Sequence, residues 1–113
     1  MADRIAATSK EAVLVDHYTE ADPTGSAVKF AFLATTADPP DISDNVWTAG
    51  TWSTAAELQT SGEHDGRYLT TARIVIGPGS AVGALTPGRW RVWTWIDAAA
   101  TDAVKRSGDL VIY

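Results

Sequence analysis

The stretch that decides the fold is Gly88-Arg89-Trp90-Arg91-Val92-Trp93-Thr94-Trp95-Ile96-Asp97. Its side chains alternate in character with a period of two, which is the period of a β-strand whose successive residues point to opposite faces. One face carries Trp90, Val92, Thr94 and Ile96, and the other carries Arg89, Arg91, Trp93 and Trp95. The first set predicts a face buried in a core. The second set is amphipathic, so we expect a neighbouring loop, strand or subunit to cover part of it.

The same period recurs elsewhere in the chain. It is clear in residues 27–33 and 71–76, and residues 109–113 form a β-rich final run. Residues 11–16 favour a strand over the helix that the Ala-rich stretch 2–14 could indicate, because no capping box opens that stretch and its Val-Leu-Val run is β-prone. Turn signals rich in Pro, Gly and Asp separate these runs at intervals of about 8–15 residues.

These runs, with residues 47–58 as a further strand, predict an all-β chain folded as a single immunoglobulin-like antiparallel β-sandwich of about seven strands. We place this domain at residues 11–113. Residues 1–10 hold little large apolar surface besides Ile5, so we expect them to form a loose N-terminal arm that becomes ordered against a partner. The inward positions predict a core made of Phe30, Phe32, Trp52, Ile74, Ile76, Trp90, Val92 and Leu110.

Composition excludes several classes of protein. The chain has 113 residues, 45% of them hydrophobic, which suits one domain with its own core. It contains no Cys, so disulfides and thiolate metal sites are excluded. The net charge of −5 argues against a nucleic-acid partner. No apolar run approaches the roughly 18 residues of a membrane span, and the first residues lack a signal peptide, so we expect no membrane partner and a cytoplasmic location.

Several motifs have the ingredients of a functional site but favour a structural interpretation. Residues 77–83 resemble a phosphate loop, yet another strand follows where a dinucleotide fingerprint needs a helix. His17 and His64 lack the spacing of metal ligands. The acidic loop of Asp38, Asp41, Asp44 and Asn45 lacks the ligand pattern of a calcium-binding EF-hand. No Ser lies in a nucleophile elbow. We therefore predict no enzyme, no cofactor and no metal.

The tryptophans carry the most specific hypothesis. Trp93 and Trp95 are two residues apart on one strand face, about 7 Å, which is near the spacing at which planar rings stack successive sugars. Together with Arg91 they are the candidate residues for contacting a protein partner or a glycan. Two interpretations stay open here: a carbohydrate-binding module, and a face covered by protein, which we favour.

Four segments carry a resemblance to known proteins. They are Trp47-Thr48-Ala49-Gly50-Thr51-Trp52 and residues 72–79, 85–93 and 107–113. Across residues 26–113 the chain resembles a group of small β-sandwich proteins of tailed bacteriophages that infect actinobacteria, encoded among the structural genes of the virion. The shared residues are turn and core positions, so they specify the fold more than the role.

The resemblance implies a non-enzymatic structural protein of a tailed-phage virion, as a head decoration protein or a component of the head–tail connector or neck. The implied partners are other virion proteins (capsid, portal or connector, and tail subunits), contacted by many symmetric copies in a particle assembled in the host cytoplasm. No catalytic residue is implied. The alternative is a carbohydrate-binding β-sandwich module that uses surface Trp residues.

Overall fold

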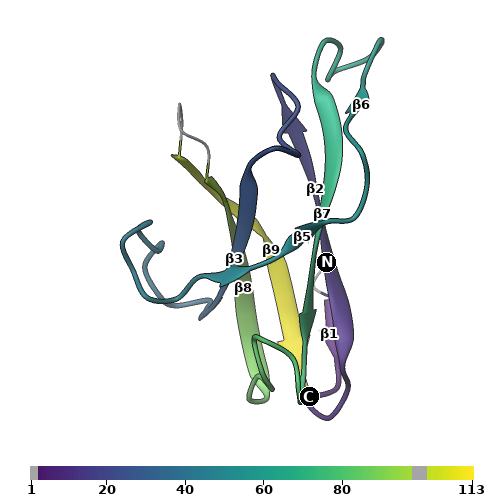
Figure 1. Ribbon diagram of the computed structural model, residues 1–113. Coiled ribbons are helices and arrows are strands. Elements are labelled where there is room, and N and C mark those ends of the chain that lie inside the picture. Colours follow the sequence, from purple (N-terminus) through teal and green to yellow (C-terminus); the bar gives the residue numbers. More distant parts are fainter. Residues whose placement is uncertain (1–2, 98–101) are drawn as a thin grey trace.

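The computed structural model describes residues 3–97 and 102–113, and in that part of the chain every regular element is a β-strand (Figure 1). The strands are β1 (Asp3–Ile5), β2 (Glu11–Thr19), β3 (Ala27–Ala34), β4 (Thr48–Ala49), β5 (Thr51–Trp52), β6 (Glu57–Leu58), β7 (Tyr68–Ile76), β8 (Gly88–Asp97) and β9 (Asp102–Ile112). They form a five-stranded sheet in the order β1-β9-β8-β3-β4 and a four-stranded sheet in the order β2-β7-β5, with β6 also paired to β7.

The predicted all-β class is confirmed, but the described residues form more and shorter strands than expected. About seven strands were predicted, and the described residues form nine. Most of the difference lies in residues 47–58, where one expected strand is divided into β4, β5 and β6. The pairing also differs in one place, because β1 runs parallel to β9 while the other strand pairs of the described residues are antiparallel.

The core lies between the two sheets and is built from the inward positions of the long strands. Five of the eight predicted core residues are buried, namely Phe30, Ile74, Ile76, Val92 and Leu110. The other three, Phe32, Trp52 and Trp90, are half-buried and pack against that core. The alternation in the sequence therefore identified the inward face correctly, including the face of β8 that carries Val92.

The chain passes from one sheet to the other at Gly50. Thr48–Ala49 pair with β3 in the larger sheet, and Thr51–Trp52 pair with β7 in the smaller one. Gly50 donates its N–H to the carbonyl of Val28 at 2.9 Å. A Cβ at this position would lie 2.5 Å from the Phe30 ring, so only glycine fits the crossing point. The expected continuous strand is broken because the chain changes sheets here.

The N-terminal segment differs from the loose arm that we expected. β1 pairs with the end of β9, placing Ile5 opposite Ile112, and the Ile5 side chain is buried in the core. The Ala7 N–H donates to the carbonyl of Tyr113 at 2.7 Å, which extends the attachment beyond β1. A Cβ on Gly77 would meet the Ser9 carbonyl, so residues 9–10 also lie tightly on the end of β7. In the structure residues 3–10 therefore lie on the domain, and residues 1–2 are outside the described part. Whether a partner changes this ordering stays a prediction.

Strand β9 carries an irregularity opposite the middle of β8. Val92 pairs with Gly108 and Trp93 pairs with Arg106, so Ser107 is an extra residue on β9. Gly108 has a φ of 148°, which suits glycine at such a β-bulge. The Ser107 hydroxyl forms a hydrogen bond with the buried Thr94 hydroxyl at 2.7 Å. The bulge thus supplies a partner for a polar side chain on the inward face of β8.

Candidate functional site

The candidate residues Trp93 and Trp95 lie on the outer face of the five-stranded sheet, as predicted, but they are covered. Each is only 9% exposed. The Lys29 ammonium lies 4.4 Å from the centroid of the Trp95 ring, and Trp47 meets the same ring edge-on at 5.5 Å. The residues that cover Trp95 therefore belong to this chain. Neither tryptophan offers the open ring face that stacking on a sugar requires.

Arg91, the third candidate residue, is held by contacts within the same sheet. Its Nε lies 3.2 Å from Oδ1 of Asp109, which stands opposite it on β9. Nη2 of Arg106 lies 3.4 Å from the other carboxylate oxygen of Asp109, Oδ2. Arg91 is half-buried, and this pair anchors β8 to β9.

The acidic loop between β3 and β4 is ordered by hydrogen bonds around Asp41. The Asp41 carboxylate accepts hydrogen bonds from the N–H of Ile42 and the hydroxyl of Ser43. The backbone N–H of Asp41 donates to the carboxylate of Asp44. Trp47 Nε1 donates to the Asp41 carbonyl at 2.9 Å. The same Trp47 that covers Trp95 therefore ties the loop to the sheet. Ile42 and Val46 are each 38% exposed on this ordered loop.

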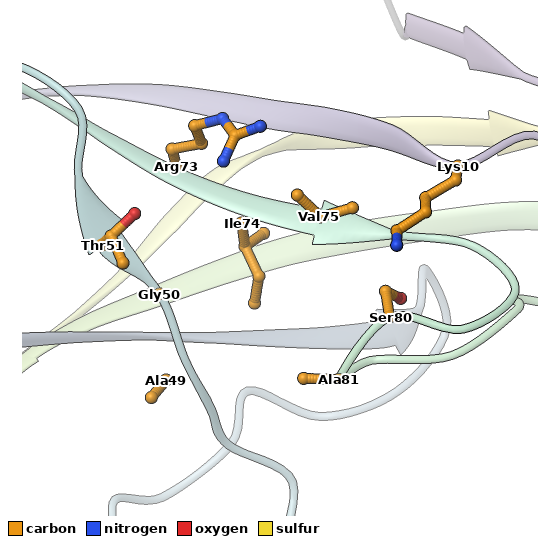
Figure 2. Close-up of a pocket in the computed structure, with 9 residues that line it drawn as sticks. All are labelled: Lys10, Ala49, Gly50, Thr51, Arg73, Ile74, Val75, Ser80 and Ala81. Carbon is orange, nitrogen blue, oxygen red and sulfur yellow. The ribbon is translucent and has the colours of Figure 1, made fainter.

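A groove of about 270 Å³ opens beside the crossing at Gly50 (Figure 2). It is lined by Lys10, Ala49, Gly50, Thr51, Arg73, Ile74, Val75, Ser80 and Ala81. Small and apolar residues make up most of the lining, and the two cationic side chains come from different elements. Sequence reasoning missed this groove because its residues come from four separate segments, and no spacing along the chain connects them.

The glycine-rich segment 77–83, weighed as a phosphate loop, forms one wall of that groove. It lies between β7 and β8 with no helix after it, as the sequence predicted. The Ser80 hydroxyl donates to the Gly77 carbonyl at 2.7 Å and accepts the Gly83 N–H at 3.0 Å. These bonds within the loop occupy the serine hydroxyl, so the loop is a closed turn rather than an open cradle of donors.

The two histidines lie on opposite faces of the smaller sheet. His17 is 3% exposed between the sheets, directly opposite Thr70, and neither His17 Nε2 nor Thr70 Oγ1 has a hydrogen-bond partner among the described residues. The pKa of His17 is lowered from 6.5 to about 4, chiefly because the ring is buried and also because of the positive charge of Lys105, against an opposing effect of Asp16. His64 instead stacks on Tyr18, with ring centroids 3.6 Å apart.

The described residues also contain no group of three or more His, Asp or Glu side chains placed to hold a metal ion. Within the same residues no helix is long and apolar enough to cross a membrane. In the described part of the chain, the fold and the surface define an all-β protein of two sheets with a covered aromatic face and an open groove. No protein-family model, no curated protein and no solved structure matches the chain.

Proposed function

We propose that this chain is a non-enzymatic structural protein that works through protein–protein contacts, as a subunit of a tailed-phage virion. Within the particle it serves as a head decoration protein or as part of the head–tail connector or neck. We further infer that its two sheets form an immunoglobulin-like β-sandwich. The crossing from one sheet to the other at Gly50 supports this architecture, because sandwiches of that class join strands across the two sheets.

The observation that carries the proposal is the display of large apolar side chains on ordered surface elements. Leu14 is 60% exposed in the middle of β2, and Tyr18 is 38% exposed near its end. Ile42 and Val46 are exposed on a loop whose backbone is fixed by Asp41. Apolar groups held in place at the surface are typical of interaction sites. A subunit in a symmetric assembly needs only modest affinity at each contact, since many copies act together.

The edge of the four-stranded sheet supports the same proposal. β2 is a nine-residue strand, and among the described residues it pairs with β7 on one side only. Long edge strands are templates for pairing with another chain unless something covers them. In an assembly the neighbouring subunit supplies that cover.

The direct test is the composition of purified virions of a tailed phage that encodes this chain. We expect mass spectrometry to find the chain at many copies per particle and cryo-electron microscopy to show it at symmetry-related positions. Its absence from washed particles would overturn the proposal. A titration of host cell-wall polysaccharide, followed by Trp fluorescence, separates the glycan alternative: we expect no shift, and a saturable shift would favour the carbohydrate-binding module.

A further inference from the structure

The groove beside Gly50 carries two cationic side chains that the rest of the described chain does not neutralise. Lys29, Arg91 and Arg106 form ion pairs with aspartates, and Arg4 lies over the Tyr113 ring. Neither Lys10 nor Arg73 makes an ion pair or a ring contact with any described residue. Arg67, Arg89 and Lys105 form no ion pair with the described residues either, so what distinguishes Lys10 and Arg73 is that they line the same groove.

The floor of the groove between these cations is apolar and made of small residues. Ala49, Val75 and Ala81 contribute small apolar side chains and Gly50 contributes none, which leaves the volume of about 270 Å³ open to solvent (Figure 2). A ligand that fits it presents an apolar side chain flanked by negative charges.

The acidic loop of this same chain has that chemistry. It places Ile42, 38% exposed, between Asp38 and Asp44 in the sequence, with Val46 exposed a few residues later. The hydrogen bonds around Asp41 fix its backbone before any contact is made, which reduces the entropy lost on binding. Figure 1 shows the loop projecting to one side of the five-stranded sheet.

Within one copy residues 38–46 do not line the groove, although the chain that follows them enters it at Ala49. Trp47 holds the loop against Trp95 on the outer face of the larger sheet. The groove is lined by Arg73 and Val75 of β7, which belongs to the smaller sheet, and by the loop that follows β7. The loop of a second copy is therefore the occupant that the charges and the apolar side chain favour.

We propose that copies of this chain associate head to tail, with the loop of residues 38–46 of one copy seated in the Lys10–Arg73 groove of the next. Ile42 packs on the apolar floor, and the loop carboxylates lie beside Lys10 and Arg73. The inference rests on the proposed assembly function, since it names one partner in that assembly. A contact between two different surfaces makes rings when the rotation closes and filaments when it does not.

Sedimentation velocity on the purified chain tests the association, at concentrations up to about 1 mM. We expect reversible self-association that weakens between about 0.05 M and about 0.5 M salt, because exposed charges are screened. Ile42→Asp and Arg73→Glu should each weaken it by about tenfold or more. Two matched controls, Leu58→Asp and Arg89→Glu, alter exposed residues elsewhere and should leave it unchanged.

A mixing experiment tests the head-to-tail geometry. Arg73→Glu keeps an intact loop and Ile42→Asp keeps an intact groove, so each should associate only weakly alone while their mixture should form a heterodimer of one copy each. In that mixture the amide signals of residues 49–51 and 80–81 should shift only in isotope-labelled Ile42→Asp protein. A monomer at every concentration, or a mixture that stays monomeric, would overturn the inference.

The outcomes are distinct from those that test the proposed function. A chain that is present in virions but does not associate through this groove overturns the head-to-tail contact alone. A chain that associates as described but is absent from virions overturns the virion role alone.

Discussion

On the five-stranded sheet the outward tryptophans Trp93 and Trp95 are each 9% exposed, whereas on the four-stranded sheet the outward Leu14 is 60% exposed. The larger sheet is covered by Trp47 and Lys29 of its own chain, and the smaller sheet has no comparable cover over Leu14 among the described residues. The aromatic residues that look most like a binding surface in the sequence are therefore part of the folded interior. The surface available to a partner is marked by aliphatic side chains instead.

The largest expected effect compares one residue from each outer face. Trp95→Ala should lower the free energy of unfolding by about 3–5 kcal/mol, because it removes a buried ring and the surface on which Trp47 packs. Leu14→Ala should cost under about 1 kcal/mol, since that side chain is already in solvent. Urea unfolding of both variants measures the two values. Similar losses at both positions would mean that the two faces do not differ as described.

The buried His17, which lies between the two sheets, makes the stability of the protein depend on pH. The pKa of His17 is about 4 in the folded chain and 6.5 in the unfolded chain, so between these values the unfolded state binds more protons. Stability should be full above about pH 6.5 and should fall by about 3 kcal/mol as the pH drops to about 4. His17→Leu should flatten this part of the profile. Thermal unfolding across the pH range measures it, and an equal slope in both proteins would contradict the assignment.

The next largest effect on the free energy of unfolding is expected at β1, the edge strand of the larger sheet. Ile5→Ala should cost about 2 kcal/mol, at the low end for a buried Ile, because β1 is a short edge strand. Amides that pair β1 with β9 should also exchange slowly in the isolated wild-type protein and quickly in the variant. Fast exchange in the isolated wild-type chain would instead support the loose arm expected from the sequence.

The smallest effect compares two arginines of β8 that share the covered face. Arg91→Ala should cost about 1 kcal/mol, because it breaks a half-buried pair with Asp109. Arg89→Ala should cost under about 0.5 kcal/mol, since Arg89 is exposed. Chemical denaturation of the two single variants resolves the difference. A larger loss at Arg89 would show that an additional contact holds that side chain.

The sequence predicted the long central strands well because their alternation is continuous. β3, β7 and β8 alternate in residue type over most of their length, and their inward residues Phe30, Ile74 and Val92 are buried. β9 was predicted only over its last residues, because the bulge at Ser107 interrupts the alternation and the preceding residues are polar or small. The break at Gly50 was missed for a different reason. A crossing between sheets depends on the position of Phe30, which no local pattern of residues 47–58 contains.

The sequence placed the candidate site and favoured a covered face, but it did not identify the residues that cover it. Periodicity correctly placed Arg91, Trp93 and Trp95 on the face of β8 opposite the core. It could not show that Trp47 lies over Trp95, because a loop has no period from which its path can be calculated. The groove of Lys10 and Arg73 was beyond sequence reasoning for a related reason. Its two cations are far apart in the chain and meet only through the pairing of the smaller sheet and the loop after β7.

The parallel pairing of β1 with β9 determines how the domain bears mechanical load. Asp3 begins one strand beside Leu110, and Ile112 ends the other beside Ile5. A pulling force applied through residues 3 and 113 acts along both strands in opposite directions, so it shears them past each other. Hydrogen bonds between parallel strands are evenly spaced, and under shear they share the force together rather than breaking one after another. A subunit tethered through both of these ends would resist extension at this edge.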